Sequence, residues 1–97
     1  MEVKKTATAG TMESSDIMVT ICNNENKGIE IQLESSVEKQ FGKQITKVIT
    51  QSAERLGLEN AQIIAVDKGA LDCVIKARVE AAIYRACEST EYRWGDK

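Results

Sequence analysis

The stretch IEIQLESSVE, residues 29–38, contains the change of pattern that decides the fold. Its first half alternates apolar and polar residues, which is typical of a strand with one buried face. Ser35 and Glu38 then fit a capping box, which predicts the start of a helix. Gly57 is suited to the C′ position and predicts the end of that helix. Apolar residues between these signals recur at helical spacing and include Val37, Phe41, Ile45, Val48, Ile49 and Leu56, with Ser52 on the same face. The pattern predicts a strand that leads directly into a helix.

Downstream of this helix, residues 61–66 (AQIIAV) form a short apolar run that predicts a second strand. A strand, a helix and a strand in succession predict a right-handed crossover with parallel strands, if both strands share a sheet. Residues 67–69 (DKG) interrupt the pattern, and a second helix is expected over about residues 70–87. Its expected apolar face consists of Leu71, Val74, Ile75, Val79, Ala82, Ile83 and Ala86.

Upstream, residues 17–22 (IMVTIC) alternate clearly, and the polar loop NNENKG at residues 23–28 follows. Two alternating runs joined by a short polar loop predict an antiparallel hairpin between residues 17–22 and 29–33. Residues 3–11 alternate more weakly and predict a further strand. The polar residues 88–97 are expected to form a loosely packed tail.

Together these elements predict one α+β domain over residues 1–97, in the order strand, strand, strand, helix, strand, helix (βββαβα). Alternating strands need one covered face, and two amphipathic helices supply the cover. The expected architecture is a two-layer α/β sandwich, in which a mixed, mostly antiparallel four-stranded sheet carries both helices on one face.

The composition excludes several functional classes. The chain has thirteen Lys and Arg and fifteen Asp and Glu, which gives a net charge of −2. A net negative charge argues against nucleic-acid binding. There is no histidine, so neither a Ser-His nor a Cys-His nucleophile can form within the chain, and an enzyme by itself is not expected. Cys22, Cys73 and Cys87 lack metal-site spacing and predict free thiols, with Cys73 and Cys87 partly exposed on the second helix.

No metal site is expected, because the chain has no histidine and its three cysteines lack metal-site spacing. No membrane span is expected, because the chain has no apolar run near 18 residues. The first residues lack the apolar segment of a signal peptide. A cytoplasmic protein is therefore the default expectation.

Three features can each be interpreted as either structural or functional. Ser14 and Ser15 lie in a polar turn before residue 17, where they could simply form the turn or present a hydroxyl. Arg78 falls on the apolar helix face, where it could pair with Asp16, Asp67 or Asp72, or contact a phosphate. Residues 67–70 could be a strand-to-helix turn or a phosphate-binding helix start.

Three blocks of sequence together resemble one family. Residues 9–16 (AGTMESSD), 35–42 (SSVEKQFG) and 67–73 (DKGALDC) with 77–81 (ARVEA) closely resemble the acyl carrier protein, or gamma chain, of bacterial citrate lyase. The resemblance covers residues from about 7 to 86, and its blocks occur in the family's order.

The resemblance implies a phosphoribosyl dephospho-coenzyme A group, joined through a phosphodiester to the first serine after Gly-Thr-x-Glu. That serine is Ser14 here, with Ser15 as the chemically equivalent alternative. The implied attachment partner is a prosthetic-group transferase, the holo-carrier synthase.

The resemblance also implies a non-catalytic carrier subunit. It would present acetyl and citryl thioesters to a transferase (alpha) and a lyase (beta) subunit, which together cleave citrate to acetate and oxaloacetate. Two alternatives stay open: the carrier subunit of malonate decarboxylase, and a small α/β interaction module without a prosthetic group.

Overall fold

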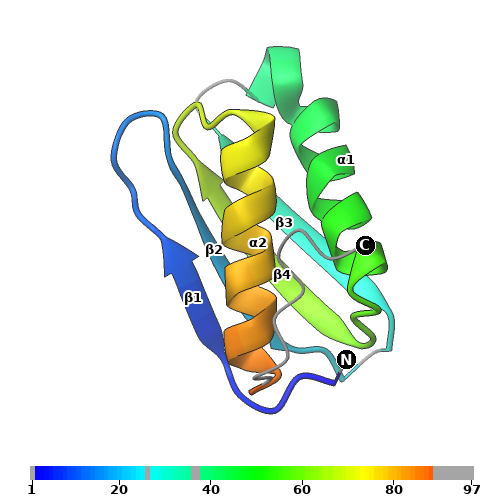
Figure 1. Ribbon diagram of the computed structural model, residues 1–97. Helices are drawn as coiled ribbons and strands as arrows, with labels where there is room; N and C mark the ends of the chain where they lie inside the picture. The colour runs from blue at the N-terminus through cyan, green and yellow to red at the C-terminus, as the bar shows by residue number, and fades with distance from the viewer. Residues whose placement is uncertain (1, 26, 36–37, 89–97) are drawn as a thin grey trace.

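The computed structural model of the chain describes residues 2–25, 27–35 and 38–88, without the side chains of residues 38–40. In these residues both helices pack on the same face of one sheet (Figure 1). This arrangement confirms the predicted α+β two-layer sandwich and its element order. The elements are β1 (Ala7–Gly10), β2 (Ile17–Asn23), β3 (Ile29–Ser35), α1 (Glu38–Arg55), β4 (Ala61–Asp67) and α2 (Asp72–Ala86).

The strand order in the sheet is β1-β2-β4-β3. β1 and β4 both run antiparallel to β2, whereas β3 runs parallel to β4. The sheet is therefore mixed and mostly antiparallel, as predicted. The predicted hairpin between residues 17–22 and 29–33 is wrong, because β4 lies between these two strands and pairs with each of them.

The β3-α1-β4 crossover is present, and its helix ends at Arg55, with Gly57 as the predicted C′ glycine. The Gly57 amide donates to the Glu54 carbonyl and the Leu58 amide to the Ala53 carbonyl, both at 3.0 Å. Gly57 has a φ of +68°, so these contacts form a Schellman motif that needs a left-handed residue. The predicted capping box from Ser35 to Glu38 spans residues 36–37, which lie outside the described residues.

The core lies between the inner face of the sheet and the two helices. In β2 and β4 every second residue is buried, as the alternation predicted. The large fully buried side chains of this core include Ile17, Val19, Ile21, Ile49, Ile63, Ile75, Val79, Ile83 and Tyr84. Two residues predicted for buried helix faces are instead exposed: Phe41 by 52% and Leu71 by 70%. Leu71 precedes the first residue of α2 as its N-cap, so the helical spacing does not apply to it.

An unpredicted ion pair joins the helices. Glu80 of α2 is 3% exposed, and its carboxylate accepts a hydrogen bond from Arg55 of α1 at 2.5 Å. Both partners lie on the sides of the helices that face each other, so neither helix alone signals the contact. The pair explains how an acidic residue is tolerated at this depth, since a buried charge needs a partner.

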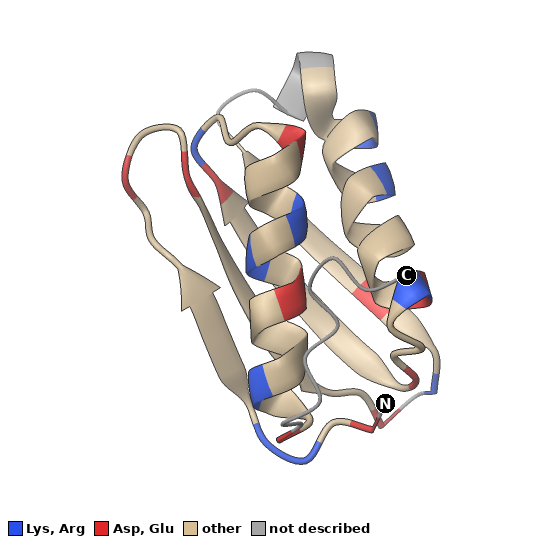
Figure 2. Cartoon of the chain, viewed as in Figure 1, with Lys and Arg blue, Asp and Glu red and all other residues tan. Residues whose placement is uncertain are grey.

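The end of the molecule opposite the β1–β2 loop is closed by the chain before β1. The Lys4 and Lys5 amides both donate to the Ala86 carbonyl at the end of α2, at 2.9 and 3.1 Å. Figure 2 shows Lys and Arg interspersed with Asp and Glu along α2. Among the described helices, none is long and apolar enough to cross a membrane. The predicted loose tail falls mostly on residues 89–97, outside the described part of the chain.

A substitution at Gly10 would test how closely β1 and β2 approach each other. It has a φ of +94°, and an added Cβ would lie 1.8 Å from the Ile17 carbonyl oxygen. We expect Gly10→Ala to lower the free energy of unfolding by roughly 2–4 kcal/mol, combining left-handed strain with overpacking. Gly28→Ala is the control, because Gly28 has a φ of +90° but open space around it. It should cost only about 1–2 kcal/mol. Equal losses in urea denaturation would contradict the role of the close contact.

Candidate functional site

The loop between β1 and β2, residues 11–16, is the tip of an antiparallel hairpin. β1 and β2 pair up to Gly10 and Met18, which brings the two ends of the loop together. Ser14 and Ser15 are both exposed on it, as the sequence predicted. Neither serine hydroxyl forms a hydrogen bond to another described residue. The loop therefore presents two accessible nucleophilic oxygens.

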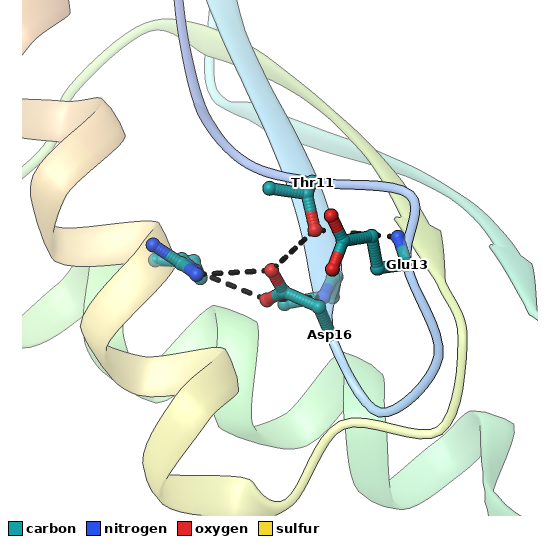
Figure 3. Close-up of polar contacts among 5 residues, drawn as sticks. Thr11, Glu13 and Asp16 are labelled. Atoms are coloured by element: carbon teal, nitrogen blue, oxygen red, sulfur yellow. Dashed lines mark hydrogen bonds and ion pairs between the residues drawn. The ribbon is translucent and has the colours of Figure 1, made fainter.

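Asp16 fixes the base of this loop from inside (Figure 3). The residue is 9% exposed, and its Oδ2 accepts a hydrogen bond from the Thr11 hydroxyl at 2.6 Å. Its Oδ1 accepts one from its neighbour's amide, that of Ile17, at 2.7 Å. Arg78 of α2 donates to both oxygens, from Nε at 3.0 Å and from Nη2 at 2.9 Å. The carboxylate thus joins the start of the loop, its end and the middle of α2.

These contacts settle the charge state of Asp16. Hydrogen bonds from Arg78, and then from Thr11, hold the pKa of the Asp16 carboxyl well below its usual range. The group stays ionised, with acceptor sites on both oxygens in use. The structural interpretation of Arg78 is confirmed, and Asp16 is its partner among the three aspartates considered.

The loop backbone is shaped and anchored by further hydrogen bonds. The Thr11 hydroxyl accepts from the Glu13 amide at 3.2 Å, and the Asp16 amide donates to the Glu13 carbonyl at 3.2 Å. Ser15 adopts a left-handed φ of 65°, and its amide donates to the Lys68 carbonyl at 2.8 Å. In return the Lys68 amide donates to the Asp16 carbonyl at 2.9 Å. The serine loop and the β4–α2 loop are therefore held as one unit.

Residues 67–70 form a strand-to-helix turn whose amides are already in use. Asp67 is 1% exposed, and its carboxylate accepts from the Gly69 amide at 3.1 Å and the Ala70 amide at 3.0 Å. The Ser35 hydroxyl donates to the same carboxylate at 2.8 Å. A phosphate at this turn would have to displace Asp67 from these two amides. The turn interpretation is therefore favoured over the phosphate-binding one.

The cysteines lie apart from this loop unit. Cys73 is exposed, as predicted, but Cys87 is buried, so the prediction of partial exposure for Cys87 is wrong. Cys87 follows the last residue of α2 and packs into the core beneath the chain that precedes β1. Burial raises the pKa of its thiol, which makes it a poor nucleophile. Within the residues that the structure describes, no cluster of His, Cys, Asp and Glu could hold a metal ion.

Sequence reasoning found part of this site and missed the rest. It placed the serines at the tip and named Asp16 as a possible partner of Arg78. It missed the double backbone contact between Ser15, Asp16 and Lys68, since main-chain hydrogen bonds between distant loops leave no mark on residue type. The Asx-type contacts of Asp67 had a signal in the Asp-x-Gly spacing, which favours a carboxylate that binds the following amides.

Comparison of the sequence with known proteins gives consistent matches. The family model of the malonate decarboxylase delta subunit matches residues 4–86. The citrate lyase acyl carrier protein of Streptococcus mutans is 56% identical over 94 residues, covering 97% of this chain and 92% of that protein. The protein of the same name from Escherichia fergusonii is 50% identical over 95 residues, covering 98% of each.

Two solved structures share the fold. A chain in the Pseudomonas malonate decarboxylase hetero-tetramer matches with a TM-score of 0.66 at 19% identity, covering 84% of each chain. Homoserine kinase from Cytophaga hutchinsonii matches with a TM-score of 0.60 at 15% identity, covering 90% of this chain and 35% of the kinase. At such low identities these likenesses concern the fold alone.

The lowered pKa of Asp16 predicts a pH dependence of stability. Its ordinary value is 3.8, and the folded value is lower, so the unfolded chain takes up this proton first as the pH falls. The stabilisation is complete above about pH 5 and is lost as the pH falls through 3.8 toward the folded pKa. We expect the free energy of unfolding, from urea denaturation, to fall more steeply between about pH 5 and pH 3 than in Asp16→Asn. Equal slopes would contradict this assignment.

Arg78→Ala should destabilise the fold, because it leaves the Asp16 carboxylate at its buried site without a cation. We expect a loss of about 2–3 kcal/mol, less than for a fully buried pair because the Arg78 side chain is 40% exposed. Arg85→Ala is the matched control on the same helix. Arg85 donates to the Thr8 carbonyl at an exposed site, so its loss should cost about 1 kcal/mol or less. Similar melting temperatures for both variants would refute the special role of Arg78.

Proposed function

The chain belongs to the citrate lyase acyl carrier protein family, and we propose that its Ser14 hydroxyl is the attachment point for a phosphoribosyl dephospho-coenzyme A group. As an acyl carrier protein, the chain depends on a covalently attached prosthetic group. The observation that supports Ser14 is its position: an exposed primary hydroxyl at the tip of a hairpin whose base is fixed. A transferase can enclose such a tip without disturbing the core.

The residues present fit a phosphodiester at this position. A serine hydroxyl that is exposed and makes no described hydrogen bond is free to act as a nucleophile. Ser15 is exposed as well, but its backbone is held against Lys68 in a left-handed conformation. Ser14 precedes this anchor point, so it has more freedom to enter the active site of another protein. This difference supports Ser14 over Ser15.

The base for attachment has to come from the partner. Asp16 is the buried carboxylate next to the serines, but Arg78 and Thr11 keep its pKa well below the usual range. A carboxylate with so low a pKa is a very weak base and would not accept the serine proton. The chain also has no histidine. We therefore assign to this chain the presentation of the hydroxyl, and to the holo-carrier synthase its deprotonation.

In use, the chain contributes position and not chemistry. When attached, the group supplies a thiol that carries acyl groups as thioesters. The hairpin tip presents this thiol in turn to the alpha and beta subunits of a citrate lyase complex. Tethering keeps the effective concentration of the thiol at each active site at about 1 mM. This division of labour is consistent with a small domain that lacks histidine and has a rigid attachment loop.

A carrier for malonate decarboxylase is the second candidate. The family model named for its delta subunit matches most of the chain, and a chain of that enzyme complex has the same fold. Identity of 50–56% to citrate lyase carriers, against 19% to the malonate decarboxylase chain, favours citrate lyase. Affinity purification from native cells would discriminate, because the subunits that co-purify belong to one enzyme or the other.

Ser14→Ala should abolish attachment without unfolding the domain. The intact mass of the chain, purified from cells that consume citrate, should include the nucleotide group for the wild type and lack it for the variant. The free energies of unfolding, from urea denaturation, should agree within about 0.5 kcal/mol, as for other exposed positions.

The matched control is Ser15→Gly, which removes the neighbouring hydroxyl and suits the φ of 65° at that position. It should still be modified. If Ser14→Ala keeps the added mass and Ser15→Gly loses it, the attachment point is Ser15. A wild-type chain without added mass would support the interaction module that has no prosthetic group.

A further inference from the structure

A groove lies between the start of α1 and the loop that leads from β4 to α2. Its volume is about 380 Å³, and its lining includes Phe41 and Ile45 from α1 and Ala70 and Leu71 from the loop. This size falls within the range of small-molecule sites, and the lining is mostly apolar.

The two sides of the groove are apolar and open to solvent. Phe41 is 52% exposed and Leu71 is 70% exposed, although both are large hydrophobic residues. The Gln44 side-chain amide of α1 donates to the Asp72 carboxylate of α2 at 2.9 Å, which links the two sides of the groove. Because the two sides are already linked, filling the groove requires little further ordering of the protein.

The groove adjoins the serine loop. Residue 68, which exchanges two backbone hydrogen bonds with the serine loop, is followed directly by the groove residues 69–72. Figure 1 shows the β1–β2 loop, the β4–α2 loop and the beginning of α1 at one end of the molecule. From the spacing of neighbouring Cα atoms and of paired strands, the Cα atoms of Ser14 and Leu71 are at most about 20 Å apart. A phosphoribosyl unit, a nucleotide and a pantetheine chain in series can span this distance.

We propose that Phe41 and Leu71 form a seat for the acyl-bearing end of the group on Ser14, which shields its thioester from water between visits to the enzyme subunits. The inference rests on the proposed function of Ser14. Tethering makes even a weak seat effective: at an effective concentration of about 1 mM, a groove with a millimolar dissociation constant is filled about half of the time. An apolar lining suits the acetyl form, because an acetyl thioester carries no charge and hydrolyses only where water or hydroxide reaches it.

The test uses the acetylated holo-carrier, purified with its attached group and checked by mass for modification at Ser14. The thioester half-life in buffer is then followed by mass spectrometry for the wild type and for Phe41→Ser combined with Leu71→Ser. If the groove is filled about half of the time, losing it doubles the exposed fraction. We therefore expect hydrolysis to be about twofold faster in the double variant.

Met12→Ser is the matched control. Met12 is as exposed as Phe41 and lies on the serine loop itself, but it does not line the groove. Its half-life should equal that of the wild type, which separates the groove from general proximity to Ser14. Both positions changed in the double variant are exposed, and its circular dichroism and melting temperature should confirm the fold.

A second readout does not depend on hydrolysis. Amide chemical shifts of residues 41–45 and 69–72 should change between the apo and acetyl-holo carriers, beyond the changes on the serine loop. A modified Ser14 with unchanged groove shifts and equal half-lives would overturn the seat while leaving the carrier function intact. Equal half-lives with weaker binding of the double variant to the enzyme subunits would also overturn it and would make the groove a subunit-docking surface. An absent modification would refute the proposed function instead.

Discussion

The ion pair between Asp16 and Arg78 is the constraint on which the functional end of the molecule depends. It joins two positions 62 residues apart, one at the foot of a surface loop and one in the middle of α2. The planar guanidinium binds both carboxylate oxygens, which fixes direction as well as distance. Thr11 completes the set of donors, so the carboxylate acts as an anchor and not as a reagent. A polar loop rich in small residues is thereby given a defined shape without burying its serines.

Local patterns located the strands and helices but not their neighbours in the sheet. Alternation and helical spacing are properties of a single element, and here they identified all six predicted elements. Pairing depends instead on which strand is best buried on both faces. β4 carries Ile64 and Val66 on the face opposite Ile63 and Ala65, which is typical of a central strand. That signal outweighs the hairpin-like loop after β2, whose short length only makes direct pairing possible.

The candidate site also has a part that the sequence predicted and a part that it could not predict. Residue types at the tip predicted an exposed serine, because hydroxyls and glycine in a polar turn have few other roles. Contacts between the two loops could not be predicted, since the amides and carbonyls of Ser15 and Lys68 are common to every residue. Leu71 was misplaced for a geometric reason: it precedes the helix by one position, and its side chain therefore leaves the buried face. The groove follows from this displacement and could not be inferred from helical spacing.

The central position of β4 also determines when the sheet can form during synthesis on the ribosome. β3 pairs only with residues 61–67, and β2 finds its second partner there, so most of the sheet cannot assemble until the second half of the chain has been synthesised. Before then only the short pairing of β1 with β2 is available, and a two-stranded hairpin is marginal in water. The nascent chain therefore spends most of its synthesis with its apolar strand faces uncovered. The hairpin that carries the serines precedes the other two strands in the sequence, yet its loop is anchored only after α2, which carries Arg78, has been synthesised.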